Sequence, residues 1–512
     1  METPMNVISP LLEADFQLIR DELKVPRIFP DAVLREAEAA AGRNPLADST
    51  SSFDDQLMIP FVTIDPPGSR DLDQAFYATR SESGYLVRYA IADVGFFVQR
   101  GSAIEKEAWN RGLTLYSPDI KTTLYPPALS EGCASLLPGE LRPAVVFSFT
   151  LDATGGVIGL TIVRSLIRSR AQLTYQEVSL HLSNEREQSG SGDLKGQEWS
   201  PSLLLLEEIG RHRKRIEVER GGINLRIPSQ QVERWSTALT GYRLAFEMAS
   251  DVEEWNAQIS LMTGIGAAQL MIEHGVGLLR TLAPPRSDRM RGLRLTAKAL
   301  AVPWPIEMDY DDFVRSLDPL NPTHAVMLHQ AARVTGGARY QAFTGGPSQH
   351  DLHSGLATFY AHATAPLRRL ADRYVLDLLC SLSSGLEPDT ELVQALTELP
   401  QVMTEADSLS RRLESALVDY VEARLMQDRV GEVFSAVIIA LRENGLVVQI
   451  AEPPIRTLIP ASIFQSENLP HLSDDGMTLN TGNQQYQLGQ SLQLKLDSVD
   501  LLARQLSLIP IH

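Results

Sequence analysis

Three aspartates lie close together in residues 63–76, "TIDPPGSRDLDQAF", and their type and spacing suit catalysis. Asp65 ends the apolar stretch "PFVTID", and Asp71 and Asp73 follow the turn "PPGSR". Because a Pro/Gly turn folds the chain back on itself, the side chain of Asp65 can converge with the other two. Three carboxylates in one pocket repel each other, and a hard divalent cation is the usual way to relieve that repulsion.

Magnesium suits such a group because it prefers oxygen ligands and retains waters while bound to one or two carboxylates and a substrate phosphate. A pair of such ions can activate a water and stabilise the leaving oxygen when a phosphodiester is hydrolysed. The other interpretation is a plain turn in which the aspartates cap the backbone. The spacing alone leaves both interpretations open.

The elements around the aspartates predict an α+β multidomain chain. Residues 1–56 read as helical and suit a helix-turn-helix-like cap, and residues 57–428 read as a mixed α/β unit with strands first and helices after residue 200. Residues 429–512 return to short strands, which predicts a five-stranded barrel of the OB type.

The charge of the chain limits how it can meet a polyanion. The net charge is −18, which argues against a protein that coats nucleic acid through its whole surface. Two runs are locally basic, "RHRKRIEVER" at 211–220 and "RSDRMRGLRLTAK" at 286–298. Each can be a solvated helix face. A polyanion would therefore have to enter through a local basic path.

Other features bear on location and partners. The two cysteines, Cys133 and Cys380, lie far apart in the sequence, which argues against a disulfide framework or a cysteine-based zinc site. No secretion signal is visible, and no uninterrupted apolar run reaches about 18 residues. We therefore expect a cytoplasmic protein without a membrane segment, and a monomer without an obligate protein partner.

Several long blocks resemble the ribonuclease II / ribonuclease R family of RNB-type exoribonucleases. They are "FVTIDPPGSRDLDQAF", "YAIADVGFFV", "GSAIEKEAWNRG", "LYSPDIKTTLYPPALSEGCASLLPGELRPAVVFSFTLD" and "FYAHATAPLRRLADRYV", in this order over residues 57–428. The resemblance implies a magnesium-dependent hydrolytic enzyme. Such an enzyme degrades single-stranded RNA processively from 3′ to 5′ and releases nucleoside 5′-monophosphates.

The resemblance gives the aspartates a role and exposes one departure. Asp65, Asp71 and Asp73 match three of the four acidic positions of the family, which makes them candidate metal ligands and catalytic residues. Gln74 stands at the fourth position, where the family usually has an aspartate that often binds magnesium. A glutamine oxygen can still be a ligand, but the lost charge should weaken a second metal position. The alternative function is an RNA-binding or regulatory protein that cleaves weakly or not at all.

"HATAPLRRLADR" is the second block that carries chemistry. Arg368 and Arg369 are expected at the start of a helix, where guanidinium groups and helix N-terminal amides can grip phosphate. We expect Arg368 to be the catalytic phosphate clamp, with Arg369 and Thr364 near the RNA backbone. The alternative is a salt-bridged helix surface in which Asp372 pairs with Arg368.

The resemblance also implies contacts to the 3′ end of RNA. Tyr116 would stack on a terminal base, and Leu225 stands where the family often has a second aromatic residue. Glu253, Glu254 and Glu414 match positions that can accept hydrogen bonds from ribose hydroxyls, and Glu254 is preferred over Glu253. Taken singly, the glutamates suit solvated helix faces, Tyr116 a half-buried loop, and Leu225 a strand in the core.

The two ends of the chain differ in how closely they follow the family. The predicted barrel resembles an S1-type RNA-binding domain, which would guide RNA toward the catalytic unit. We expect the helical residues 1–56 to stand in place of the two cold-shock-type barrels that relatives commonly carry. A third hypothesis, a metal-dependent phosphodiesterase for small nucleotides, is disfavoured by the barrel.

Overall fold

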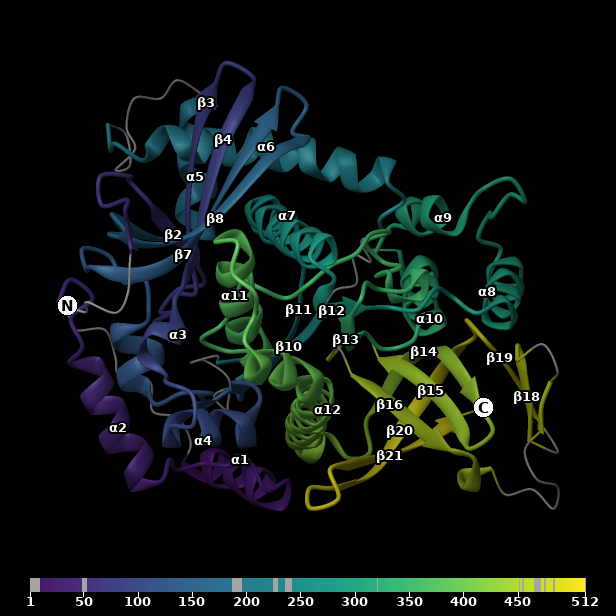
Figure 1. The fold of residues 1–512 in the computed structure, drawn as a ribbon. Helices are drawn as coiled ribbons and strands as arrows, with labels where there is room; N and C mark the ends of the chain where they lie inside the picture. Colours follow the sequence, from purple (N-terminus) through teal and green to yellow (C-terminus); the bar gives the residue numbers. More distant parts are fainter. Residues whose placement is uncertain are drawn as a thin grey trace.

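The computed structural model describes the chain in segments, which are residues 10–47, 53–186, 196–223, 229–234, 242–319, 321–450, 452–453, 455–464, 471–473, 476–481 and 484–511. A large sheet lies at one side of the molecule and a smaller barrel at the other. The helices α7 (Asp251–Glu273), α11 (Leu370–Ser383) and α12 (Thr390–Met426) lie between them (Figure 1). The expected α+β architecture is confirmed. The predicted Leu225 contact falls outside the described residues.

The large sheet has seven strands in the order β1-β8-β7-β4-β3-β2-β9. Its strands are β1 (Asp54–Asp55), β2 (Val62–Asp65), β3 (Gln74–Ser81), β4 (Gly84–Ala92), β7 (Arg142–Asp152), β8 (Val157–Ile167) and β9 (Ala171–Thr174). Neighbouring strands run antiparallel from β8 to β2, whereas β9 pairs with β2, and β1 with β8, in parallel. The parallel pair at the β9 edge carries Asp65.

Helices cover the sheet because its central strands are apolar on both faces. On β7, the residues from Pro143 to Phe147 are all buried, as expected for a strand packed on two sides. The helices that contact the sheet include α5 (Tyr175–Arg186), α6 (Ser200–Glu219) and α11. The helix α7 is joined to β4 through the hydroxyls of Ser260 and Tyr89. The short elements α3 (Val94–Phe97), α4 (Ala103–Arg111), β5 (Leu115–Tyr116) and β6 (Lys121–Thr122) connect β4 to β7.

In the described part of the chain, two hairpins and the helices α8 (Ser287–Ala299), α9 (Tyr310–Ser316) and α10 (Pro322–Val334) lie, together with α7, between α6 and α11 in the sequence. The hairpin strands are β10 (Ser229–Arg234) with β11 (Tyr242–Glu247), and β12 (Val276–Thr281) with β13 (Arg339–Thr344). The helices α8, α9 and α10 form a separate small core. The indole ring of Trp304 stacks on Phe313 in this core, with ring centroids 3.9 Å apart.

The C-terminal barrel is built on a five-stranded antiparallel sheet with the order β16-β15-β14-β20-β21. These strands are β14 (Val433–Arg442), β15 (Gly445–Ile450), β16 (Arg456–Pro460), β20 (Ser491–Asp500) and β21 (Gln505–Ile511). A small sheet of β17 (His471–Leu472), β18 (Thr478–Asn480) and β19 (Gln485–Gln487) is added to it. The arrangement is consistent with the expected OB-type domain.

The first two helices are α1 (Pro10–Glu22) and α2 (Asp31–Ala41), and α1 packs against the long helix α12 (Thr390–Met426). Phe16 and Tyr420 meet edge to face, with ring centroids 5.9 Å apart. A buried ion pair, 2.8 Å between Arg20 Nη1 and Asp119 Oδ1, fixes α1 to the loop after Tyr116. Among the described helices, none combines the length and the hydropathy that a membrane crossing requires.

Candidate active site around the aspartate cluster

The parallel pair β2–β9 positions Asp65. Asp65 is the last residue of β2 and lies opposite Thr174 of β9. The three residues before it are buried, so the strand is anchored in the core up to the partly buried carboxylate. The side chain therefore starts from a rigid element.

The loop from Asp65 to Asp73 is fixed by the segment that carries Ser135. The hydroxyl of Ser135 donates to the carbonyl oxygen of Arg70 at 2.6 Å and accepts from the amide of Leu72 at 2.9 Å. Leu72 is fully buried. Gly68 has φ 79°, a left-handed conformation that glycine adopts without strain. The loop is consequently held at several points, and the aspartates at its end have defined directions.

Asp73 is buried and already has protein partners. The backbone amide of Leu367 donates to its Oδ1 at 2.8 Å, and Arg368 Nε donates to its Oδ2 at 3.3 Å. Burial raises the pKa of Asp73 to about 7, and the Arg368 guanidinium and the Leu367 amide oppose that rise. The charged form thus depends on these two donors.

Asp65 has the opposite character, because one of its oxygens has no partner. Oδ2 of Asp65 is buried without a hydrogen bond of ordinary geometry. Burial raises the pKa of Asp65 to about 7, the negative charge of Asp71 adds to the rise, and Arg368 opposes it. A buried carboxylate oxygen without a donor is the kind of group that a cation stabilises.

Asp71 is paired with a lysine that the sequence pattern did not reveal. Lys121 Nζ lies 2.7 Å from Asp71 Oδ1 and 2.9 Å from Glu131 Oε1. The hydroxyl of Tyr116 donates to Asp71 Oδ2 at 3.4 Å. Lys121 belongs to β6, which pairs with the strand of Tyr116. A lone lysine five positions after that tyrosine gave no sequence signal of its own.

Because Asp71 and Asp73 already have protein partners, the three carboxylates do not come together as one set of metal ligands. Within the described segments, no three or more His, Cys, Asp or Glu side chains are placed so that they could hold a metal ion. Asp71 is engaged by Lys121, and Asp73 by Arg368 and Leu367. Asp65 is the carboxylate of the cluster that has a free buried oxygen.

Gln74 is committed to the protein at both ends of its amide. Its Nε2 donates to the carbonyl oxygen of Thr364, and its Oε1 accepts from the hydroxyl of Tyr89 at 3.2 Å. The same hydroxyl lies 2.8 Å from Ser260 Oγ of α7. Gln74 therefore joins β3 directly to the segment before Arg368, and it is linked to α7 through the hydroxyl of Tyr89.

The expected helix at Arg368 begins later than the sequence pattern predicts. The helix α11 starts at Leu370, and Arg369 has extended backbone angles, φ −133° and ψ 122°. The amide of Thr114 donates to the carbonyl oxygen of Arg368 at 3.0 Å, and Arg369 forms a β-bridge with Leu113. This bridge holds the two arginines outside the helix.

The ion pairs of the two arginines also differ from the alternative interpretation, in which Arg368 pairs with Asp372. Arg369 pairs with buried Asp372 through two hydrogen bonds of 2.8 and 2.9 Å. Arg368 pairs with Asp73 instead, and its side chain is 43% exposed. Within the described residues, no hydrogen bond engages its two terminal nitrogens. The side chain of Arg368 is thus available at the surface beside the cluster.

The glutamates of α7 have structural partners. Glu253 completes a capping box with Ser250, accepting from its amide at 2.6 Å while the Ser250 hydroxyl accepts from the Glu253 amide at 3.3 Å. The sequence "SDVE" carries this capping signal. Glu254 forms an ion pair with Lys214 of α6. Glu414 is exposed on α12, and no hydrogen bond joins it to the described aspartate cluster.

Tyr116 is the aromatic group at the entrance to the cluster. Its side chain is 52% exposed although its hydroxyl points to Asp71. Thr364, by contrast, is buried and contributes its carbonyl oxygen to Gln74. The site therefore offers an exposed ring, an exposed guanidinium and carboxylates with raised pKa values within one surface region.

Comparison with known proteins gives this geometry a context. A profile of the RNB domain matches residues 53–384. The ribonuclease R of Aquifex aeolicus is 28% identical over 451 residues, which cover 85% of this chain and 61% of that protein. The chain spans about 60% of the length of the curated relatives it matches.

Solved structures are similar in fold. Mycoplasma genitalium RNase R in complex with ribose-methylated single-stranded RNA superposes with a TM-score of 0.86 at 21% identity, over 98% of this chain and 78% of that chain. Yeast Ssd1, described as a pseudonuclease, superposes with a TM-score of 0.64 at 15% identity, over 85% of this chain and 53% of that chain.

Proposed function

Because this chain belongs to the RNB domain family, we propose that it is a divalent-metal-dependent 3′→5′ exoribonuclease acting in RNA degradation. The finer proposal is magnesium-dependent, processive hydrolysis of single-stranded RNA to nucleoside 5′-monophosphates. The observation that carries it is the meeting of Asp65, Asp71 and Asp73 with Arg368 at the end of β2. The ribonuclease R relatives support the substrate and direction.

The donor set fits a hard divalent cation. Asp65 offers a buried oxygen without a hydrogen bond of ordinary geometry, and the carboxylates of Asp71 and Asp73, which Lys121 and Arg368 hold in place, would supply the further oxygen ligands. A bound magnesium ion would lower the pKa of a coordinated water and neutralise charge on the phosphate. Gln74 is not proposed as a ligand, because both ends of its amide already have partners.

Arg368 is proposed to bind the scissile phosphate. Its Nε holds Asp73, so its two terminal nitrogens remain for a phosphate in a forked arrangement. A single side chain would thus orient a ligand carboxylate and counter the charge that grows on the phosphate during hydrolysis.

Tyr116 is proposed to stack on the base at the 3′ end. The exposed ring lies beside Asp71, so a stacked nucleotide would present its phosphate near the aspartates. Glu254 would have to leave Lys214 before it could accept a hydrogen bond from a ribose hydroxyl. Glu253 and Glu414 are further candidates for that interaction. Thr364 and Arg369 are proposed to position the site, Thr364 through its backbone carbonyl and Arg369 through its ion pair with Asp372.

The experiment that tests this function is incubation of single-stranded RNA with the protein in magnesium and in EDTA. We expect nucleoside 5′-monophosphates in magnesium, none in EDTA, and none from Asp73→Asn. Chromatography against nucleoside 3′- and 5′-monophosphate standards identifies the products. Products with 3′-phosphates, or products that persist in EDTA, would contradict the proposal.

A second candidate is an RNA-binding protein of the same fold that cleaves weakly. It is favoured by the engagement of Gln74 with Thr364 at a position where the family usually supplies a carboxylate, and a pseudonuclease shares the fold. Strong RNA binding without products would select this candidate. A Gln74→Asp variant that strongly gains activity would instead show that the missing carboxylate limits catalysis.

A further inference from the structure

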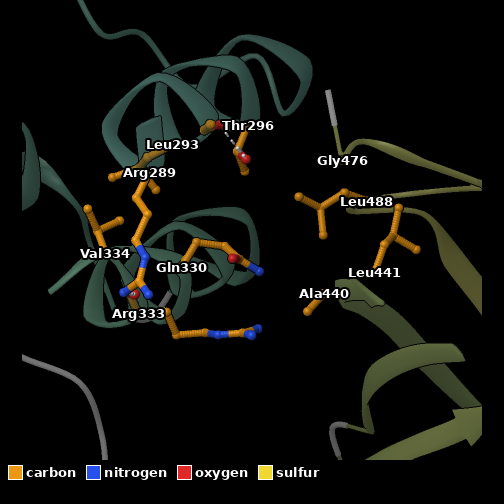
Figure 2. Close-up of a pocket in the computed structure, with 11 residues that line it drawn as sticks. Arg289, Leu293, Thr296, Gln330, Arg333, Val334, Ala440, Leu441, Gly476 and Leu488 are labelled. Carbon is orange, nitrogen blue, oxygen red and sulfur yellow. Dashed lines mark hydrogen bonds between the residues drawn. The ribbon is translucent and has the colours of Figure 1, made fainter. Parts of the chain in front are cut away.

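A cavity of about 580 Å³ lies between the helices α8 and α10 and the C-terminal barrel. Arg289 of α8 and Arg333 of α10 line one side, and Leu441 of β14 and Leu488 lie on the barrel side (Figure 2). The cavity lies away from the large sheet that carries the aspartate cluster, since α8 and α10 are on the barrel side of the molecule (Figure 1). It is therefore separate from the site described above.

Positive charge gathers at this cavity without acidic partners. Within the described part of the chain, no aspartate or glutamate forms an ion pair with Arg289, Arg333 or Arg442. Burial and the positive charges of Arg442 and Arg289 lower the pKa of Arg333. Burial, together with Arg456, Arg333 and Arg442, lowers the pKa of His329 to about 4. In a chain of net charge −18, an uncompensated group of arginines indicates an anion site.

The walls of the cavity are fixed. Arg289 Nη1 donates to the carbonyl oxygen of Arg333 at 3.2 Å, which ties α8 to α10. The side-chain amide of Gln330 donates to the carbonyl oxygen of Ile439 at 2.5 Å, which ties α10 to β14. Because helix and barrel are joined on both sides, the arginines face a cavity of defined width.

The shape and chemistry suit a nucleotide unit. Guanidinium groups bind phosphate through a planar fork, and the apolar side chains of Leu293, Val334, Leu441 and Leu488 offer a wall for a sugar or base. The volume is in the range of small-molecule sites and exceeds what a phosphate alone needs. Arg442 ends β14 at the turn to β15, and loops at this place in OB folds bind oligonucleotides.

We propose that this arginine cavity is a second phosphate-binding site, which holds a backbone phosphate of an RNA strand remote from the aspartate cluster. The choice of RNA as the ligand rests on the proposed function. A strand long enough to reach both sites gains affinity from the cavity, whereas a dinucleotide held at the cluster does not.

The test measures binding, not cleavage, so that it is independent of whether the chain is an active nuclease. The whole chain carries Asp73→Asn and is kept in EDTA. A fluorescent single-stranded oligoribonucleotide and a dinucleotide are titrated with this protein and with versions that add Arg289→Gln and Arg333→Gln. Arg291→Gln is the matched control, because Arg291 is exposed on the same helix and is not among the residues that line the cavity.

We expect the double arginine variant to bind the long strand roughly tenfold more weakly, while the control and the dinucleotide are unchanged. The slope of log affinity against log salt should become shallower by about 0.7 for each RNA phosphate that the variant no longer neutralises. An equal melting temperature in the variants excludes unfolding as the cause.

Competition by inorganic phosphate and by a nucleoside 5′-monophosphate distinguishes the sources of phosphate. Unchanged binding of the long strand in the double variant overturns the proposal. Arginine-dependent binding of the monophosphate, with long-strand binding unchanged, likewise overturns the assignment to RNA.

Discussion

The side-chain amide of Gln74 donates a hydrogen bond to the carbonyl oxygen of Thr364, and Tyr89 donates to the other end of the same amide at 3.2 Å. The first of these bonds joins the first strand residue after the aspartates to the segment that leads to Arg368. Gln74 thus supports the cluster as a cross-link between distant parts of the chain, at the position where the resemblance to the family predicts a metal-binding acid.

Gln74→Glu should destabilise the protein in a pH-dependent way when no metal is present. An ionised glutamate would oppose the Thr364 carbonyl oxygen, whereas the protonated acid can still donate to it. The folded-state pKa of the new side chain is therefore raised above its unfolded value of about 4.3. Stability is retained below that pH and is lost as the pH rises through the folded-state pKa. We expect a loss of about 1–3 kcal/mol at alkaline pH, measured by urea unfolding.

The control for this prediction is Tyr89→Phe. It removes the other hydrogen bond of the Gln74 amide without adding a titrating group, so its effect should not vary over the same pH range. A Gln74→Glu variant with the pH profile of the wild type would contradict the assigned hydrogen bond.

Asp65→Asn should stabilise the metal-free protein above neutral pH. Burial raises the pKa of Asp65 to about 7, so the folded wild type is penalised progressively from about pH 4 up to pH 7. The variant removes that penalty, about 4 kcal/mol at pH 8, and leaves stability unchanged at pH 4. Melting temperatures in EDTA measure the difference.

The same variant tests the metal proposal without an activity assay. Added magnesium or manganese should raise the melting temperature of the wild type and should have little effect on Asp65→Asn. An equal metal-induced shift in both proteins would remove Asp65 from the ligand set.

Lys121→Met should strengthen metal binding. Lys121 neutralises Asp71 and Glu131 at 2.7 and 2.9 Å, so its loss leaves a carboxylate available to a cation. We expect a severalfold lower Kd for manganese in calorimetry. Lys106→Met is the control, because Lys106 is exposed on α4. Weaker binding in Lys121→Met would mean instead that the lysine positions Asp71 for the metal.

Tyr116→Ala should weaken binding of the RNA 3′ end. The exposed ring is proposed to stack on a base, an interaction worth about 1–3 kcal/mol. Tyr116→Phe keeps the ring and removes the hydroxyl that reaches Asp71, so it should retain the affinity. Binding is measured on the Asp73→Asn background in EDTA. An equal loss in both variants would assign the effect to the hydroxyl.

Local sequence was sufficient for the strands of the large sheet and of the barrel and for the long helices, because hydrophobic periodicity reports burial on each element. It did not predict the hairpins β10–β11 and β12–β13, which lie within a part of the chain that was expected to be mainly helical. It also located Asp65, Asp71 and Asp73, which one short loop carries. The partner of Gln74 could not be predicted, because Thr364 comes near it only through the packing of distant segments. The helix start at Arg368 was misplaced for the same reason, since the β-bridge of Arg369 with Leu113 overrides local helix preference.

Two other contacts differ in how far the sequence reveals them. The capping box of Ser250 and Glu253 can be recognised from four consecutive residues, and it indicates a structural role for Glu253. Lys121 carried no comparable signal, because a lysine on a two-residue strand is ordinary until the fold brings Asp71 and Glu131 to it.

The most direct test of the proposed 3′→5′ exoribonuclease activity follows a single-stranded RNA labelled at its 5′ end through a time course in magnesium. We expect the labelled strand to shorten progressively from its 3′ end with the wild-type protein, and to stay intact with Asp73→Asn. A labelled strand that is bound but never shortened at any magnesium concentration, or one that is first cut internally, would contradict it.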